Sequence, residues 1–297
     1  MRANFGAIGS RALRWAAIAA AAILLVGAVW MWKIAWRSPP HYVPRADIRV
    51  RAPIMSAAEY ERVSASHARP FVYEATVGRG AVLVFGASHT KDPADPQIAE
   101  FRRRFSSFAP TAVLVEGRPG SPIAGIADPV RQFGEAGLAI ALSRAASVSY
   151  WSWEPSRDGE TGAMLFSFPK DRVALFYILR PYVSNLRHGK PADPNAALEA
   201  IRAKRVAWPG LEGSFASVAE IDSLWKRDFE GLPDWRDTSD EFGWPGYLSE
   251  IASRSRDLRT ENMARSALDL CSKGERVLLV CGSSHAGRAK AAIVGEE

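Results

Sequence analysis

Two histidines stand at matching places in two similar segments of the chain. Val82-Leu-Val-Phe-Gly-Ala-Ser-His89 and Leu278-Leu-Val-Cys-Gly-Ser-Ser-His285 each run from an apolar stretch through a glycine and two small residues to a histidine. A neutral imidazole takes up and returns protons near neutral pH, and it also binds divalent metal ions. The repeated pattern predicts that His89 and His285 serve one chemical site. The alternative, a helix cap and a buried core histidine, is the commoner meaning of a single Gly-x-x-His.

Two carboxylates stand where two other apolar runs end. Glu116 closes the run that starts at residue 111, and Glu154 follows the aromatic run 149–153. Burying a carboxylate is costly unless it is paired or coordinated, so both are candidate metal ligands or partners of the histidines. The alternative for each carboxylate is that it caps the helix that follows. For Glu116, which precedes Gly117 and Arg118, a further alternative is a side chain that faces solvent.

Arg259 is the candidate cation of the site. On a helix predicted for 245–273 it shares a face with Leu248, Met263 and Leu270. Because a guanidinium keeps its proton, on an apolar face it needs an acidic partner or an anionic ligand. We expect Arg259 to be paired and directed into the site. The alternative is a side chain of which only the stem is buried.

These side chains need a sheet to bring them together. Short apolar runs predict buried strands, and helical patterns lie between them. The strands are expected at 81–85, 112–115, 148–153 and 277–281, and the helices at 96–108, 134–146, 171–186 and 245–273. This alternation predicts an α/β fold with a mainly parallel central sheet flanked by helices. Because ligands collect at the carboxyl ends of parallel strands, we expect the polar residues to meet at one rim.

The N-terminus predicts a membrane anchor that precedes the α/β fold. Residues 15–32 contain no charge and measure about 27 Å as a helix, close to the apolar thickness of a bilayer. Tryptophans lie at both ends of this stretch, where they favour the membrane interface. A cleaved signal peptide is the alternative, but Trp30-Met-Trp-Lys33 offers no small-residue cleavage site. We expect a basic tail at 1–14, a transmembrane helix at 15–36, a tether leading into the domain at 37–75, and the α/β domain at 76–297.

The charge distribution bears on partners and location. Residues 1–51 hold eight of the 38 Lys and Arg but one of the 32 Asp and Glu, so the rest of the chain carries 30 basic and 31 acidic residues. A near-neutral domain lacks the basic surface that nucleic-acid binding requires. We therefore expect membrane lipid around 15–36 as a partner and no nucleic acid. We also expect an inner-membrane, single-pass protein with its C-terminal domain outside the cytoplasm.

The two cysteines do not identify a compartment. Cys271 ends a helical pattern and Cys281 lies in an apolar run. Both are predicted to be small buried side chains. A disulfide formed outside the cytoplasm is the alternative.

Taken in order, these motifs resemble the TraB/TIKI family, within the superfamily that also includes erythromycin esterases and ChaN-like haem-binding proteins. The resemblance covers about 80–290, with no matching motif between about 160 and 240. It rests on Gly-Ala-Ser-His at 86–89, Val-Leu-Val-Glu at 113–116, Arg-Thr-Glu-Asn-Met-Ala at 259–264 and Gly-Ser-Ser-His at 282–285. It implies hydrolysis, by a divalent-metal peptidase in some members and by an esterase with a histidine base in others.

Carried over position by position, the resemblance implies a membrane-anchored, metal-dependent hydrolase of peptides or esters. The implied catalytic residues are His89, Glu116, Arg259 and His285, and the implied ligands of Mn, Co or Zn are His89, Glu116, Glu154 and His285. Such a metal lowers the pKa of a bound water and polarises a carbonyl. Without metal, a histidine backed by Glu116 activates water and Arg259 stabilises the oxyanion. Members of the family often have Asn or Asp directly after the arginine, whereas this chain has Thr260. The sequence thus differs from the family pattern at one residue that would support the site.

Two further classes of function stay open. One is a membrane-tethered protein of ChaN-like type that binds haem or another ligand without hydrolysis, with Tyr150 or Tyr182 as a candidate axial ligand. The other is a scaffold that has kept the fold without activity. Substrate choice depends on the unmatched middle segment, whose tryptophans either line a cleft or pack in a core: Trp208, Trp225, Trp235 and Trp244.

Overall fold

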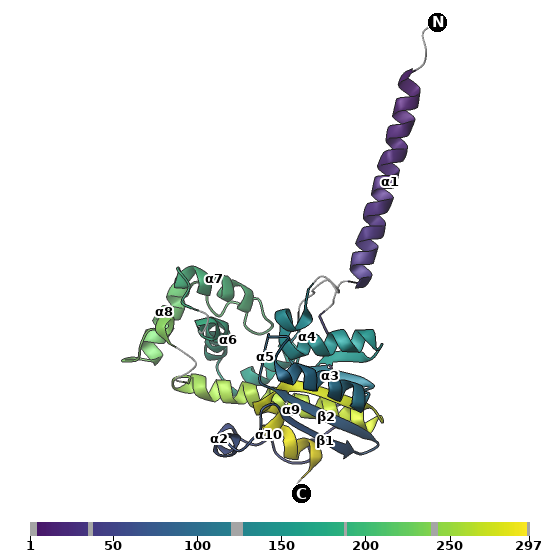
Figure 1. Cartoon of the computed structure of the whole chain (residues 1–297). Coiled ribbons are helices and arrows are strands. Elements are labelled where there is room, and N and C mark those ends of the chain that lie inside the picture. Colours follow the sequence, from purple (N-terminus) through teal and green to yellow (C-terminus); the bar gives the residue numbers. More distant parts are fainter. Residues whose placement is uncertain (1–4, 35–37, 120–126, 187–188, 239–242, 296–297) are drawn as a thin grey trace.

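The computed structural model describes residues 5–34, 38–119, 127–186, 189–238 and 243–295. Side chains within the first helix are described at 14–29 only. Figure 1 shows a sheet with helices on both of its faces, a second group of helices beside it, and one long helix that projects from the N-terminal end. This arrangement is an α/β fold, as the sequence predicts.

The sheet has five strands in the order β1-β2-β5-β3-β4. Every neighbouring pair is parallel except β1 and β2, which form an antiparallel hairpin through Gly78 at φ +62°. The strands are β1 Phe71–Val77, β2 Gly80–Ala87, β3 Ala112–Val115, β4 Ser149–Ser152 and β5 Arg276–Gly282. The prediction of a mainly parallel sheet is confirmed. The antiparallel β1 was not predicted, and all but its last two residues lie in the range 37–75 that was assigned to the tether.

Alternate side chains of the strands meet helices on opposite faces. One face packs against α3 Pro96–Phe108 and α4 Pro129–Ala145 through residues such as Phe85 and Val113. The other packs against α9 Tyr247–Ser272 and α10 Ser283–Val294 through residues such as Val84 and Leu114. Because both faces are covered, the central strands are apolar along their whole length.

A second core lies beside the sheet, in the part of the chain without a matching motif. Its helices are α5 Arg157–Ser167, α6 Lys170–Asn185, α7 Pro194–Arg205 and α8 Val218–Asp228, followed by the 3₁₀ turn η2 Trp235–Asp237. Helix α9 joins the two cores because it has 26 residues and is therefore about 39 Å long. Leu248 and Ile251 near its start pack with α6 and α8, while Met263 and Ala267 pack on the sheet.

The segment that precedes β1 lies against the domain. His41 forms a parallel bridge to Ser152 of β4, and the hydroxyl of Tyr42 donates to Asp269 of α9 at 2.8 Å. Asp269 is fully buried and also accepts from Nε of Arg45 at 2.7 Å. Helix α2 Ala57–Ser64 follows, with Ser56 and Glu59 in a capping box.

Helix α1 covers Phe5–Ile34 and projects away from the sheet in Figure 1. Its described apolar side chains are exposed, among them Trp15, Ile23 and Leu24. In the described part of the chain, no helix has both the length and the apolar content that crossing a bilayer requires. Residues 1–4 and the side chains of Trp30, Trp32 and Trp36, on which the predicted tail and anchor also rest, lie outside the described residues.

Candidate active site

The carboxyl ends of β2, β5 and β3 lie next to one another because β5 inserts between the two earlier strands. His89 comes two residues after β2, Glu116 directly follows β3, and Gly282 is the last residue of β5. The N–H of Gly282 donates to Oε2 of Glu116 at 2.8 Å. A Cβ at Gly282 would come within 2.6 Å of Nε2 of His89, so the absence of a side chain there lets the imidazole lie against the backbone.

Arg259 reaches this rim from α9 and holds both predicted carboxylates. Its Nε donates to Oε2 of Glu154 at 2.6 Å, its Nη2 donates to the other oxygen of Glu154, and Nη2 lies 3.4 Å from Oε1 of Glu116. The Arg259 side chain is 12% exposed. Burial alone would lower the pKa of Arg259, but the hydrogen bonds and charge of Glu154, with the charge of Glu116, outweigh it and raise that pKa. Arg259 is therefore a permanent cation that links the ends of β3 and β4.

His285 lies in the first turn of α10 and is buried, with 6% of the residue exposed. Its Nδ1 is 2.8 Å from the Thr260 hydroxyl, which in turn donates to the Arg256 carbonyl at 2.8 Å. Because the hydroxyl has one proton, both contacts are satisfied only when Nδ1–H of His285 donates, which leaves Nε2 as an acceptor. Thr260, the departure from the family pattern, thus assigns the tautomer.

The environment of His285 keeps its ring neutral. Burial, followed by the charges of Arg259, Arg288 and Arg256, lowers the pKa of His285 to about 3. The Trp153 ring meets the imidazole edge to face with centroids 5.3 Å apart. A group with so low a pKa is a weak base, so His285 is suited to accept a hydrogen bond and is poorly suited to carry a proton.

His89 has the opposite surroundings. It adopts φ +55° in the loop after β2, and 64% of its side chain is exposed. Its Nδ1 lies 3.9 Å from Oε2 of Glu135, a buried carboxylate whose Oε1 accepts from the N–H of Thr90 at 2.8 Å. Glu135 follows the kink of α4 at Gly134, where φ is +57°. The sequence interpretation missed Glu135, although a lone carboxylate within the apolar helix pattern 134–146 was a signal of a buried partner.

Two cavities open among these residues. The first, of about 160 Å³, is lined by Ala87, His89, Glu116, Phe133, Glu135, Ala136, Val280 and Cys281. The second, of about 230 Å³, is lined by Phe176, Arg180, Trp244, Ala252, Ser255, Arg256, Arg259 and His285. The two predicted histidines therefore face different cavities. The ion pair between Glu116, which lines the first cavity, and Arg259, which lines the second, connects the two cavity walls.

The predicted metal ligands do not fit a metal site in this arrangement. Both oxygens of Glu154 accept from Arg259, and the oxygens of Glu116 face the N–H of Gly282 and Nη2 of Arg259. Within the described ranges, no three His, Cys, Asp or Glu side chains lie close enough to share an ion. The carboxylate oxygens instead bind protein groups, and the two histidines line different cavities.

The cysteines are unpaired, as the first interpretation of the sequence predicts. Cys271 and Cys281 are free and buried. Burial raises the pKa of Cys271 to about 12 and also raises the pKa of Cys281. Cys281 lines the smaller cavity, but a protonated buried thiol is a poor nucleophile.

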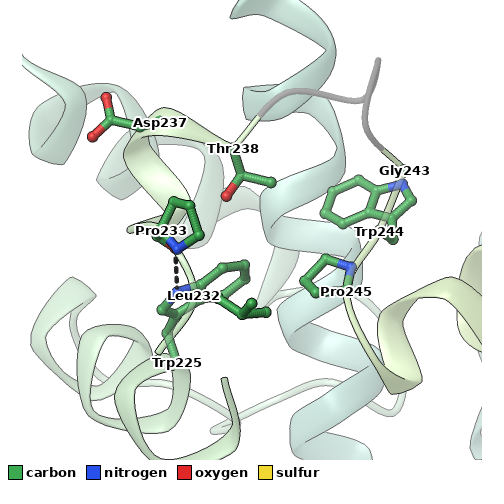
Figure 2. A pocket seen from close by; sticks show the side chains of 8 residues that line it. All are labelled: Trp225, Leu232, Pro233, Asp237, Thr238, Gly243, Trp244 and Pro245. Atoms are coloured by element: carbon green, nitrogen blue, oxygen red, sulfur yellow. Dashed lines mark hydrogen bonds between the residues drawn. The ribbon is translucent and has the colours of Figure 1, made fainter. Parts of the chain in front are cut away.

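The four tryptophans of the middle segment divide into two groups. Trp225 and Trp244 line a cavity of about 330 Å³ on the helical part of the molecule, together with Leu232 and Pro233 (Figure 2). Trp208 packs on Tyr177, with ring centroids 5.5 Å apart, and Trp235 is 1% exposed. The apolar cavity carries no group suited to acid–base chemistry beyond Asp237 among its described lining residues.

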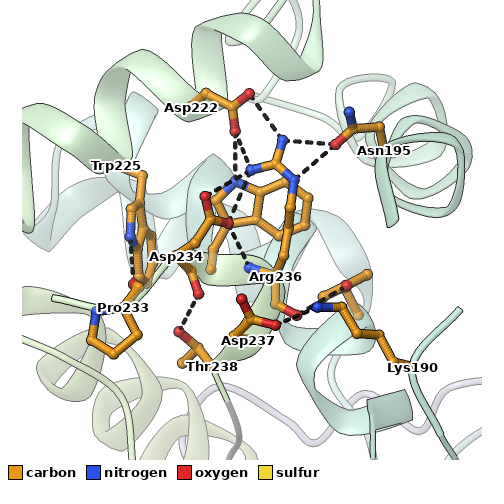
Figure 3. Close-up of polar contacts among 11 residues, drawn as sticks. Lys190, Asn195, Asp222, Trp225, Pro233, Asp234, Arg236, Asp237 and Thr238 are labelled. Carbon is orange, nitrogen blue, oxygen red and sulfur yellow. Dashed lines mark hydrogen bonds and ion pairs between the residues drawn. The ribbon is translucent and has the colours of Figure 1, made fainter. Parts of the chain in front are cut away.

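The polar network beside that cavity is structural. Figure 3 shows Arg236 between Asp222, Asp234 and Asn195, with Nη1 2.9 Å from Oδ1 of Asp234 and Nη2 2.7 Å from the Asn195 amide oxygen. Asp222 also accepts from Nε1 of Trp235 at 2.8 Å. These bonds hold η2 against α7 and α8.

Neither candidate axial tyrosine lies at the histidine rim. The Tyr182 hydroxyl donates to the Arg236 carbonyl at 3.3 Å, and its ring meets Trp235 edge to face. Tyr150 lines a surface hollow with residues 147–151 and Arg144. The haem alternative has no support from these two positions.

No protein-family model, curated protein or solved structure matches this chain. The resemblance to the TraB/TIKI family therefore stays a prediction that rests on the four motifs.

Proposed function

We propose that this chain is a hydrolase of ester or peptide bonds in which His89 is the general base. The observation that carries the proposal is the exposed imidazole of His89, with Nδ1 in ion-pair range of buried Glu135 and Nε2 against Gly282 at the start of α10. A carboxylate behind a histidine orients the ring and stabilises the imidazolium that forms during proton transfer. The four motifs that resemble the TraB/TIKI family support the same reaction class.

The reaction follows from the atoms around His89. Nε2 takes a proton from water, the water oxygen attacks the carbonyl carbon, and the imidazolium then returns the proton to the leaving oxygen or nitrogen. Helix α10 begins directly beside Nε2 and has no side-chain cap, and we assign to the amide N–H groups of its first turn the stabilisation of the negative charge on the carbonyl oxygen. No metal ion takes part in these steps.

Arg259, Glu116 and His285 have positioning roles in this scheme. Glu116 holds the N–H of Gly282 and thereby the junction of β5 and α10. Arg259 neutralises Glu116 and Glu154, so its charge is not available to the oxyanion as the sequence-based hypothesis assumes. His285 stays neutral beside Arg259.

The test compares His89→Gln with His67→Gln, using the full chain in detergent and a panel of p-nitrophenyl esters and peptide p-nitroanilides. We expect kcat/KM to fall by about 10²- to 10⁴-fold in His89→Gln and to be unchanged in His67→Gln, because His67 stacks on Phe71 and is not among the residues that line the two rim cavities. Equal rates in both variants would refute the proposal. A rate that is lost on chelation and restored by Mn, Co or Zn would replace it with metal-dependent chemistry.

We also propose that α1 holds the domain at a membrane, with lipid around 15–36. The described apolar side chains of this helix are exposed, and α1 projects away from the folded part (Figure 1). Such side chains gain free energy when lipid covers them. Flotation of the full chain with liposomes is the expected result, and a chain that stays at the bottom of the gradient would contradict it.

A further inference from the structure

Among the described residues that line the larger cavity at the rim, three carry a guanidinium group and none carries a carboxylate. Arg180 comes from α6, and Arg256 and Arg259 come from α9. The remaining polar lining residues are Ser255 and the neutral His285. The wall of this space of about 230 Å³ is therefore strongly cationic.

Two of these three cations have no acidic partner. Within the part of the chain that the structure describes, Arg180 and Arg256 form no ion pair with a carboxylate within 4.0 Å, whereas Arg259 pairs with Glu154 and Glu116. Burial and the charge of Arg259 lower the pKa of Arg180, and burial and the charge of Arg288 lower that of Arg256. A guanidinium keeps its proton despite such shifts, so both are cations without a carboxylate in direct contact, and Glu160 and Glu154 act on Arg180 and Asp257 on Arg256 only from a longer distance.

The carboxylates nearest to the cavity are already engaged. Glu154 and Glu116 accept from Arg259, as described above. Glu160 accepts from the hydroxyls of Tyr177 and Ser255, each at 2.8 Å. These acids hold the wall in place and line none of the cavity.

An aromatic pair completes the wall. The rings of Phe176 and Trp244 meet edge to face with centroids 5.5 Å apart, and Arg180 lies 5.9 Å from the Phe176 ring. Ligand sites commonly combine such apolar surface with a few converging polar groups, in pockets of about 300–1,000 Å³. A cavity somewhat below that range suits one acidic group with one ring or a short chain.

We propose that this cavity is a binding site for a small organic anion, whose carboxylate or phosphate group is bound by Arg180 and Arg256 of its wall and whose apolar part packs on Trp244 and Phe176. Guanidinium groups bind both kinds of oxyanion through paired, charge-assisted hydrogen bonds. The bound anion supplies the direct ion-pair partner that these two arginines do not have among the described residues. The inference does not depend on hydrolysis at His89, because it concerns the other cavity and is measured by binding.

Calorimetric titration of the full chain in detergent tests the site with three probes of similar size: phenyl phosphate, benzoate and neutral benzyl alcohol. We expect at least one of the two anions to bind at least tenfold more tightly than benzyl alcohol. The better anion identifies whether phosphate or carboxylate is preferred. Anions that bind no more tightly than benzyl alcohol would overturn the proposal.

The arginines are tested with Arg180→Gln and Arg256→Gln, with Arg254→Gln as the matched control on the exposed side of α9. We expect a Kd at least tenfold weaker in the first two variants and an unchanged Kd in the control. Part of the Arg256 side chain is accessible to solvent although the residue lines the cavity, so its variant decides the outcome where Arg180→Gln does not fold. An Arg256→Gln variant with the affinity of the control would refute the site. The His89→Gln variant is expected to keep wild-type affinity even where hydrolysis is lost.

Discussion

The two Gly-x-Ser-His segments are alike in sequence and opposite in environment. His89 is 64% exposed on a side chain that belongs to a loop, whereas His285 is almost wholly buried within the first turn of a helix. The cause is the chain that follows each strand. After β2 the loop continues to Pro96 before α3 begins, while α10 begins at Ser283, directly after β5. A helix that starts at once turns its early side chains back over the sheet.

One motif thus stands in two different environments. The imidazole of His89 is exposed beside Glu135, and that of His285 is held neutral by burial and by three arginines. Residues of the neighbouring strands add to the difference. The carboxyl end of β5 is covered by Glu116, which follows β3, and by His89, which follows β2.

The largest expected effect comes from removing the cation beside His285. Arg259→Gln leaves Glu154 and Glu116 without their partner in a largely buried place. We expect the free energy of unfolding to fall by about 3–5 kcal/mol, measured by chemical denaturation. Arg254→Gln on the exposed side of α9 is the control and should change it by less than about 0.5 kcal/mol. Similar values for the two variants would show that the Arg259 ion pairs contribute little.

The second prediction concerns how the free energy of unfolding depends on pH because of the buried histidine. The unfolded chain protonates His285 near pH 6.5, whereas the folded chain does so only near pH 3. Between these values the unfolded state binds more protons, so the free energy of unfolding decreases as the pH falls. This group contributes a loss of about 1.4 kcal/mol per pH unit well below pH 6.5. His285→Gln should remove that part of the slope between pH 6 and 4.5.

The control for the pH experiment is Arg254→Gln on the exposed side of α9, which removes no histidine. Because a guanidinium keeps its proton, this variant should keep the wild-type slope. An unchanged slope in His285→Gln would mean that the ring is protonated in the folded protein at mildly acidic pH, against the environment described above.

The third prediction uses the equivalent glycines of the two segments. A Cβ at Gly86 would lie 2.6 Å from the Cβ of Ala286 and 2.7 Å from the Phe71 carbonyl oxygen, whereas a Cβ at Gly282 meets the ring of His89 first. We expect Gly86→Ala to lower the free energy of unfolding by about 1–3 kcal/mol. Gly282→Ala should cost less than about 1 kcal/mol, because an exposed side chain can move aside.

The Gly282→Ala variant also bears on the function. Displacing the His89 ring from the start of α10 should reduce hydrolysis while the fold is retained. Melting temperature and kcat/KM measured on the same preparations give both readouts. Equal destabilisation by the two alanines, or full activity in a stable Gly282→Ala, would contradict the placement of His89.

The strands and their helices were largely predictable because their signals are local. The apolar runs at 112–115 and 277–281 correspond closely to β3 and β5, and the Asp95-Pro96 start predicts α3 to the residue. Strand β1 was not predicted because most side chains of Phe71–Val77 are only partly buried, so the segment has no clear hydrophobic pattern. Helices α5, α7 and α8 escaped because they pack in their own core, away from the sheet.

The sequence indicated which polar residues belong to the site, but it did not indicate which of them pair with each other. A buried polar side chain at the end of an apolar run signals that a partner exists, and Arg259, Glu116 and Glu154 do pair. Which partner it finds depends on strand order, which local patterns do not contain. Glu135 joined His89 only because the kink at Gly134 brings α4 to the loop after β2.

The α/β class and the positions of the principal strands follow from the sequence alone, because hydrophobic periodicity is a property of the chain. The three-dimensional fold was needed to show that β5 lies between β2 and β3, that the two imidazoles predicted to share one site line different cavities, and that Arg180 of α6 and Arg256 of α9 line the same one. These features arise from contacts between segments up to about two hundred residues apart, and burial and charge act through those contacts rather than through sequence spacing.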